Sequence, residues 1–264
     1  MRTVLRSGCI DYGVTRIMGI LNVTPDSFHD GGRRLDDAVE HAIRMAGGGA
    51  DVIDVGGQST RPGFVPVHVE EEMRRVVPVI EEIADISSVP ISVDTFNPSV
   101  AAAALDAGAV VVNAVGGASE EMMKIVADRG AALIITHVPA HIASVHGTVM
   151  EGDVIEQILT FFRRKTEAAA DAGIANDRIV LDPGIGFGKS SAQNLDILRN
   201  TDRFCGKFPV MVGASMKRFL ADAFPGMTKE DASIEAAKIA VSKGASMVRV
   251  HDVKRTCDAL RRRP

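Results

Sequence analysis

The strongest constraint on the fold is a unit that recurs eight times along the chain. Each unit is a short apolar run rich in Val, Ile and Leu, followed by a turn and a longer amphipathic stretch. The runs are nearly continuous rather than alternating, which is typical of parallel strands buried on both faces. The expected strands are Arg16–Val23, Asp51–Val55, Pro90–Asp94, Ala109–Val115, Ala131–His137, Arg178–Asp182, Phe208–Val212 and Ser246–His251.

The amphipathic stretches between these runs predict helices that alternate with the strands. They are Leu35–Gly49, Glu70–Ile86, Asn97–Ala107, Ser119–Arg129, Asp153–Gly173, Ala192–Asp202, Ala232–Gly244 and Asp252–Arg262. Eight such alternations favour an α/β fold of the closed (β/α)8 TIM-barrel type, forming a single domain over residues 1–264. We expect the first fifteen residues to form a short N-terminal hairpin across the bottom of the barrel. An open, doubly wound sheet is the alternative, because periodicity alone does not establish closure.

Composition excludes several classes of partner. The net charge of −4 gives no basic surface for nucleic acid. No apolar run reaches the roughly eighteen residues that a membrane span needs, so we expect no membrane partner. The three cysteines are widely spaced and form no CxxC pair, which argues against a disulfide framework or a zinc site. Reduced thiols fit a cytoplasmic protein best.

Polar side chains gather where the predicted strands end. In a barrel of this type these ends face one mouth, where the active site is built. A single buried carboxylate can be a structural hydrogen-bond partner, but a whole series in register is costly to bury without a ligand. The series consists of Asn22, Asp54, Asp94, Asn113, His137, Asp182, Lys217, Arg249 and His251.

The chemistry of this series narrows the ligand. Three carboxylates and an amide can accept the adjacent N–H donors of a flat heterocycle such as a pterin or a guanine, and a lysine can bond its ring carbonyl. Asn22, Arg61, Arg249 and His251 suit an anion such as pyrophosphate. Two long segments, Thr24–Arg34 and Ser59–Val69, are expected to act as lids.

Several segments resemble the signatures of the dihydropteroate synthase family, in order from the first strand to the last. They are Leu21-Asn22-Val23-Thr24-Pro25-Asp26-Ser27-Phe28, Asp54-Val55-Gly56-Gly57-Gln58-Ser59-Thr60-Arg61-Pro62-Gly63, Ile91-Ser92-Val93-Asp94-Thr95, Leu181-Asp182-Pro183-Gly184-Ile185-Gly186-Phe187-Gly188-Lys189 and Arg249-Val250-His251-Asp252-Val253. The resemblance implies a transferase that joins 6-hydroxymethyl-7,8-dihydropterin diphosphate to 4-aminobenzoate and releases pyrophosphate.

The resemblance also implies roles for individual residues. Asp94, Asn113, Asp182 and Lys217 would hold the pterin. The pyrophosphate would be held by Asn22, Arg61, Arg249 and His251, with Mg2+ at Asn22. Thr60, Pro62 and Phe187 would shape the site of the second substrate. The arylamine is already nucleophilic, so the reaction needs positioning and stabilisation of the leaving anion rather than a strong base.

The chain departs from the family pattern at five places. Gln58 and Ala114 replace a usual Glu and Asp, and His137-Val138-Pro139-Ala140 replaces His-Met-Gln-Gly. The last two departures lie after the seventh strand, where Met216 and Arg218 flank Lys217 in place of Arg and Ser. The segment Pro139–Val149 brings two histidines, His141 and His146, which we interpret as lying in a solvated loop rather than binding an anion or a metal.

Arg218 suggests that the second substrate differs from a bare carboxylate. One candidate is a phosphorylated ribosyl-aminobenzene of the kind used to make methanopterin-type coenzymes. Two other functions remain open: pterin-dependent methyl transfer to a corrinoid protein, and pterin binding without catalysis. The family resemblance implies a homodimer built through late helices, where Ala236, Ala237, Ile239 and Ala240 could lie at the interface. We favour the interior of the molecule for these four side chains.

Overall fold

The computed structural model describes residues 1–6, 8–23, 33–58, 67–139 and 149–261. Within these ranges, eight parallel strands form one sheet in the order β8-β7-β6-β5-β4-β3-β10-β9. Their bounds are β3 (Arg16–Asn22), β4 (Val52–Gly56), β5 (Ile91–Asp94), β6 (Val111–Val115), β7 (Ala132–Thr136), β8 (Ile179–Asp182), β9 (Met211–Val212) and β10 (Met247–Val250).

The sheet closes on itself between its two outer strands. A parallel bridge joins Leu181 in β8 to Val210, and the Leu181 N–H donates to the Pro209 carbonyl at 2.9 Å. All residues of β4, β6 and β7 are buried, as expected for strands enclosed by a ring of helices. The predicted barrel is therefore confirmed over the open sheet.

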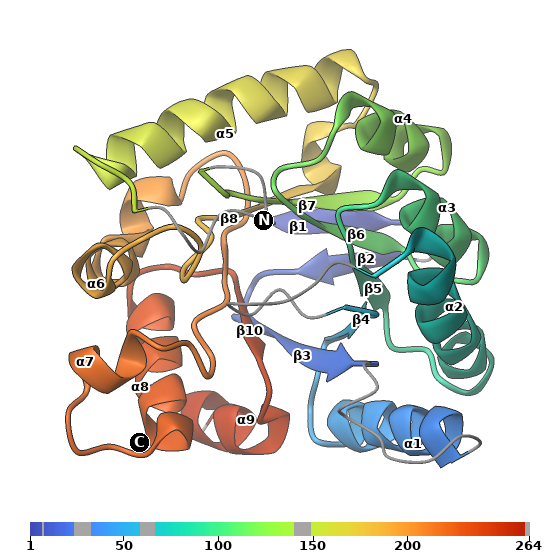
Figure 1. Cartoon of the computed structure of the whole chain (residues 1–264), viewed down its shortest axis with the longest axis horizontal. Coiled ribbons are helices and arrows are strands. Elements are labelled where there is room, and N and C mark those ends of the chain that lie inside the picture. The colour runs from blue at the N-terminus through green and yellow to red at the C-terminus, as the bar shows by residue number, and fades with distance from the viewer. Residues whose placement is uncertain (7, 24–32, 59–66, 140–148, 262–264) are drawn as a thin grey trace.

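Helices surround the barrel on its outside (Figure 1). Those expected from the sequence are present with ends shifted by a few residues. They are α1 (Arg33–Gly47), α2 (Val69–Ile86), α3 (Pro98–Asp106), α4 (Glu120–Asp128), α5 (Val154–Asp171), α6 (Ser191–Arg199), α8 (Lys229–Ser242) and α9 (Val253–Arg261). The predicted sixth helix is shorter than expected, because its last turn is a separate 3-10 helix, η4 (Thr201–Phe204). Another 3-10 turn, η3 (Asn176–Arg178), leads into β8, and a short helix that was not expected, α7 (Leu220–Ala223), precedes α8.

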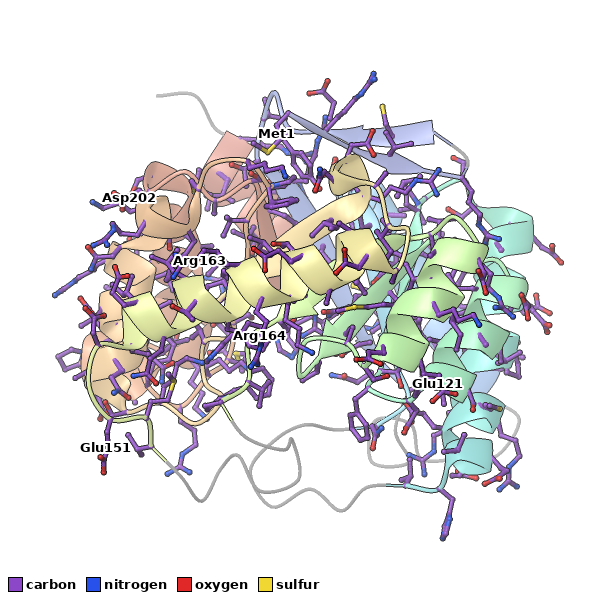
Figure 2. All side chains as sticks on the ribbon, turned by 90° about the horizontal axis from the view of Figure 1, so that it is seen from above. Met1, Glu121, Glu151, Arg163, Arg164 and Asp202 are labelled. Carbon is purple, nitrogen blue, oxygen red and sulfur yellow. The ribbon has the colours of Figure 1, made fainter. Side chains whose placement is uncertain are left out.

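The amphipathic pattern of the helices sets which side faces the barrel. In α5, Ile158 and Phe162 are buried, whereas Arg163 and Arg164 lie on the exposed outer side (Figure 2). In α8, Ala236, Ala237 and Ala240 are buried in the main core and Ile239 is partly buried against it, so the interior placement holds fully for the three alanines. No helix in the described part of the chain is long and apolar enough to cross a membrane.

The N-terminal hairpin closes the end of the barrel opposite the strand ends discussed above. Strands β1 (Arg2–Leu5) and β2 (Gly8–Asp11) pair antiparallel. Leu5 and Ile10 pack in a separate apolar cluster with the first residues of several barrel strands, such as Val52 and Met247. This apolar cluster fills the end of the barrel where the strands begin, and the polar residues lie at the opposite end, where the strands finish.

Candidate active site

The predicted strand-end residues meet at the carboxyl ends of β4, β5, β6, β8 and β10. Register alone places Asp94 beside Asn113 and Thr136 beside Asp182. The guanidinium of Arg249 then joins two carboxylates from different strands, with Nε 2.6 Å from Asp54 Oδ2 and Nη2 2.6 Å from Asp94 Oδ2. These contacts bring chain positions up to 195 residues apart into one cluster.

Asp54, one of the three strand-end carboxylates expected to accept N–H donors, is the centre of this cluster, although the family resemblance implied no specific role for it. Its side chain is completely buried, and its Oδ2 also accepts a 3.0 Å hydrogen bond from Asn113 Nδ2. Asn113 Oδ1 in turn accepts from the Thr136 hydroxyl at 3.3 Å. Its position at a strand end, in register with the other polar residues, was the signal that placed it in the predicted series.

Burial and charge act in opposite directions on the ionisation of the cluster. Burial raises the pKa of Asp94 to about 7, against the lowering effect of the Arg249 charge, and the nearby Asp54 carboxylate adds to the rise. Burial alone would lower the pKa of Arg249, but the Asp54 and Asp94 carboxylates raise it above its ordinary value. Burial also raises the pKa of Asp182, opposed by the Gly184 N–H, which donates to Asp182 Oδ1 at 2.7 Å.

Two carboxylate oxygens in the cluster still lack a hydrogen-bond partner among the described residues. They are Asp54 Oδ1 and Asp94 Oδ1, both shielded from solvent. Buried polar atoms of proteins are nearly always hydrogen-bonded, so unpaired acceptors of this kind call for an explanation. A ligand that carries N–H donors would satisfy them.

A lysine and an apolar wall flank the carboxylates. Lys217 follows β9, and its Nζ lies 4.4 Å from the centre of the Phe187 ring, within the range of a cation–π interaction. Phe187 packs with Val115 and Val138 in a small buried cluster, against which Phe96 also packs. Val138, which stands where the family usually has Met, therefore contributes to an apolar wall beside the polar cluster.

A buried lysine holds the segment between β8 and α6, a role that the sequence analysis did not assign. Lys189 Nζ is 2.8 Å from the Gly184 carbonyl, 3.0 Å from the Phe187 carbonyl and 3.1 Å from His137 Nδ1. Burial lowers the pKa of Lys189 to about 7 and that of His137 to about 3. His137 is thus a neutral ring that belongs to this support rather than an anion-binding cation. Gly184 has a φ of +68°, and an added Cβ would lie 1.9 Å from the His137 carbonyl oxygen.

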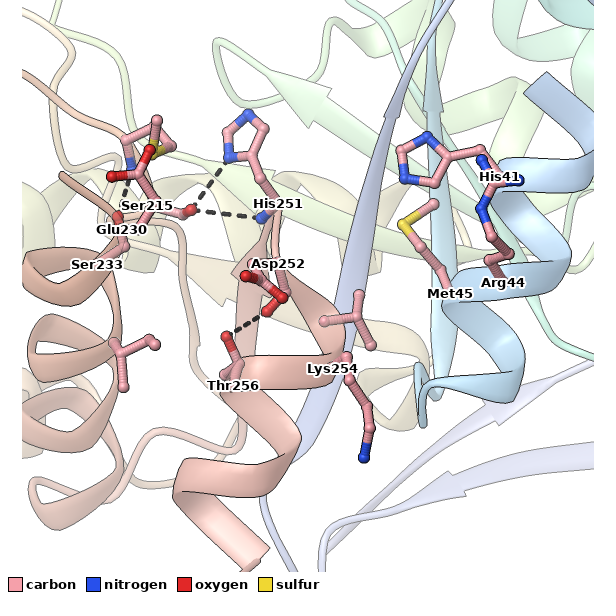
Figure 3. Close-up of a pocket in the computed structure, with 13 residues that line it drawn as sticks. His41, Arg44, Met45, Ser215, Glu230, Ser233, His251, Asp252, Lys254 and Thr256 are labelled. Carbon is pink, nitrogen blue, oxygen red and sulfur yellow. Dashed lines mark hydrogen bonds between the residues drawn. The ribbon is translucent and has the colours of Figure 1, made fainter. Parts of the chain in front are cut away.

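Asn22 ends β3, and His251 directly follows β10. A Cβ built on Gly56 would be 3.7 Å from Asn22 Oδ1 and 3.8 Å from Asp94 Oδ2, which places Asn22 beside the carboxylates. His251 Nδ1 is 3.0 Å from the Ser215 hydroxyl. Figure 3 shows Ser215 and His251 at the edge of a cavity of about 420 Å³, with His41 and Arg44 of α1 on the opposite side.

Some predicted residues are not brought into the cluster. Arg218 lies after β9 with an exposed side chain. Thr60, Arg61 and Pro62 fall outside the described residues, as do His141, His146 and most of the three segments expected to be lids or altered loops. Among the residues that are described, no group of three or more His, Cys, Asp or Glu side chains could hold a metal ion.

Comparison with known proteins agrees with this geometry. Residues 18–251 match the family model described as pterin binding enzyme. The dihydropteroate synthase of Escherichia coli K12 is 38% identical over 267 residues, which cover 99% of this chain and 95% of that protein. A probable bifunctional folylpolyglutamate synthase/dihydropteroate synthase of Haloferax volcanii is 46% identical over 245 residues, which cover 90% of this chain but 29% of that longer protein.

A solved structure gives the same result in three dimensions. The dihydropteroate synthase of Xanthomonas albilineans with 4-aminobenzoic acid superposes with a TM-score of 0.89 at 40% identity, over 96% of this chain and 93% of that one. Both sequence and fold therefore match over nearly the whole length. The chain belongs to the pterin-binding enzyme family, and its relatives within that family are dihydropteroate synthases.

Proposed function

We propose that the chain condenses 6-hydroxymethyl-7,8-dihydropterin diphosphate with the amine of 4-aminobenzoate and releases pyrophosphate. The observation that carries the proposal is the buried cluster of Asp54, Asp94, Asn113 and Arg249, with two unpaired carboxylate oxygens. The relative from Xanthomonas albilineans was solved with 4-aminobenzoic acid, which supports the choice of arylamine.

The carboxylates and the amide suit the edge of a pterin. Adjacent ring and exocyclic N–H groups would donate to Asp182 and Asp94, and Asn113 would pair with a further ring nitrogen. Lys217 would donate to the ring carbonyl, and the wall that contains Phe187 would exclude water from one face. The removal of water strengthens each of these electrostatic contacts.

Departure of the diphosphate leaves positive charge on the pterin methylene, and the leaving anion needs stabilisation. Arg249, His251 and Arg61 would supply donors for its oxygens, which is a preorganised electrostatic contribution. Arg249 now bridges Asp54 and Asp94 at 2.6 Å, so anion binding would compete with, or add to, these ion pairs. The arylamine nitrogen then has to be held in line with the methylene, and the proton that it loses on forming the C–N bond would pass to the released pyrophosphate.

Mg2+ would fit the diphosphate end through few protein ligands. Asn22, whose side-chain oxygen lies beside the carboxylates, would hold the ion together with the bound diphosphate. The ion would draw negative charge from the leaving group. Chelation with EDTA should then lower pyrophosphate release while leaving the binding of a pterin without a diphosphate unchanged.

Arg218 supports a finer proposal about the second substrate. Its exposed side chain, next to Lys217, would meet a phosphate rather than a carboxylate if the arylamine carried a phosphoribosyl group, as in methanopterin-type pathways. Thr60, Pro62 and Phe187 would contact the aromatic ring. If Arg218→Ser leaves the preference between the two arylamines unchanged, this finer proposal is wrong.

The decisive assay measures pyrophosphate release from dihydropterin diphosphate with Mg2+ and either arylamine. Release with 4-aminobenzoate supports the proposal, and release only with the phosphoribosylated compound supports the finer one. No release with either compound refutes it and would direct the next assay to methyl transfer to cobalamin.

We further propose a homodimer in the cytoplasm. The three cysteines, Cys9, Cys205 and Cys257, are free thiols in the structure, which suits a reducing compartment. Sedimentation velocity of the full chain would test the dimer, and a monomer at micromolar concentration would contradict it.

A further inference from the structure

A second buried carboxylate, Glu72, lies outside the cluster of Asp54, Asp94, Asn113 and Arg249, on helix α2. Glu72, in the first turn of α2, is completely buried. Its Oε1 accepts a 2.7 Å hydrogen bond from the Thr95 hydroxyl, and its Oε2 accepts from Gln58 Nε2 at 2.8 Å and from Asn97 Nδ2 at 2.5 Å. A buried carboxylate is tolerated only with such compensation, so the position demands an explanation.

The three donors come from the ends of two neighbouring strands of the candidate site. Gln58 follows β4, which carries Asp54, and Thr95 follows Asp94 directly at the end of β5. Asn97 is the residue directly before α3, but its side chain makes no capping hydrogen bond to the helix and donates to Glu72 instead. One carboxylate of α2 thus ties together the chain segments that leave both strands.

Close packing leaves this connection little freedom. A Cβ built on Gly57 would lie 2.9 Å from Glu72 Cγ and 2.8 Å from Val76 Cγ1, so the backbone after β4 rests directly on α2. One turn along the helix, Arg75 Nη1 donates to the Gly57 carbonyl at 2.9 Å. A shift of Glu72 or Gln58 would therefore be transmitted to the ends of β4 and β5.

The amide of Gln58 matters because of its charge. Glu72 faces Arg75 from its own helix and the Asp94 carboxyl from β5, and burial raises the pKa of Glu72 while its hydrogen bonds and Arg75 lower it. Nε2 of Gln58 is a donor at every pH. A glutamate at position 58, the residue usual in the family, would bring a second acid against Glu72, and two adjacent carboxyls then share a proton.

We infer that Glu72 and Gln58 form a positioning pair that fixes the spacing between the ends of β4 and β5, and that the amide at position 58 makes this spacing independent of pH. The inference rests on the proposed function, since the spacing concerns Asp94 of the pterin site and Asp54, which Arg249 bridges to it. Neither residue needs to touch a substrate.

The test compares Gln58→Glu and Glu72→Gln with the exchanged double variant Gln58→Glu/Glu72→Gln. The double variant restores one acid and one amide in the reverse order and is the matched control for charge and volume. Three quantities are measured between about pH 6 and about pH 8.5, because a like-charged neighbour raises the pKa of a carboxyl into this window. They are calorimetric affinity for the dihydropterin diphosphate, pyrophosphate release, and thermal unfolding.

We expect the pterin affinity of Gln58→Glu, relative to that of the unsubstituted protein, to fall about tenfold as pH rises through this window. A tenfold change corresponds to a shift of one pKa unit in a group whose ionisation is linked to binding. The double variant should recover most of that loss and show a flat ratio. The KM for the pterin substrate should change more than kcat, because the pair acts on the binding geometry.

The inference is overturned if Gln58→Glu lowers the unfolding temperature as pH rises while its relative pterin affinity stays constant, because the pair would then be structural alone. Failure of the double variant to recover affinity would also overturn it. A protein that binds the pterin but releases no pyrophosphate would refute the proposed function and leave the affinity ratios to decide on the pair, whereas absence of pterin binding would refute both.

Discussion

Replacement of Arg249 by Met tests whether the cluster depends on the cation that bridges its two carboxylates. Methionine keeps a long apolar stem but removes a guanidinium that lies 2.6 Å from both Asp54 Oδ2 and Asp94 Oδ2. The two carboxyls then lose the cation that bridges them, although Lys217 remains nearby. The Asp54 side chain is fully buried and that of Asp94 is 13% exposed, so water compensates for little of this loss.

The size of the effect follows from this burial. Removing one partner of a buried ion pair costs about 3–5 kcal/mol, and the 17% exposure of the Arg249 side chain favours the lower end. For a chain of this length, about 3 kcal/mol corresponds to a fall in Tm of roughly 6–12 °C. The deficit should shrink as pH falls below 7, because Asp94, whose pKa lies at about 7, becomes neutral and no longer needs the cation.

The assay is thermal unfolding at about pH 8.5 and about pH 5.5, on either side of a carboxyl that titrates near neutrality. Arg129→Met is the matched control, because Arg129 makes two hydrogen bonds of 2.8 and 3.0 Å to Asp106 at the surface. Exposed ion pairs contribute little, so the control should unfold close to the parent protein. Equal Tm values for the two variants at both pH values would refute the reasoning.

Three further predictions concern the same site. Asp94→Asn should weaken pterin binding about tenfold to a hundredfold, since a charge-assisted hydrogen bond is worth about 1.5–3 kcal/mol, and calorimetry that shows unchanged affinity would contradict this. Burial raises the pKa of Asp94 to about 7, so its contribution to stability is full below about pH 4 and is lost as pH rises through about 7. The free energy of unfolding in urea should accordingly depend less on pH in Asp94→Asn than in the unsubstituted protein. The same pH dependence in both proteins would argue against this. Gly184→Ala should cost more than about 2 kcal/mol, because a left-handed φ is combined with a clash against the His137 carbonyl, and an unchanged midpoint of urea unfolding would argue against it.

Much of the fold could be predicted because it depends on local patterns. Nearly continuous apolar runs separated by amphipathic stretches predicted the barrel strands and the long helices, and the structure confirms them together with the N-terminal hairpin. The short helix Leu220–Ala223 was missed, because four residues are too few for a helical period to be visible.

The site could be predicted as a set of residues but not as a set of contacts. Strand register brings Asp94 and Asn113 together, and this follows from their positions at the ends of adjacent strands. The bridge from Arg249 to Asp54 depends on barrel closure and on side-chain conformations, neither of which a pattern of residue types contains. Lys189 appeared in the sequence only as the last residue of a family motif. Its structural role could not be predicted, because it donates to backbone carbonyls, which every residue type carries.

Closure of the barrel itself is uneven around its circumference. Neighbouring strands such as β3 and β4 pair over five residues, but β9 has two residues and meets β8 through a lone bridge at Leu181 and Val210. This seam should therefore be the place where the ring opens first in native-state fluctuations, as local stability follows the density of hydrogen bonds and contacts. Hydrogen exchange would then be faster at the Leu181 amide than at the amides of β4, and equal protection would contradict it. Asp182 and Lys217 lie on opposite sides of the seam. Transient opening of the seam would therefore change the distance between them and alter ligand affinity without any substitution in the site.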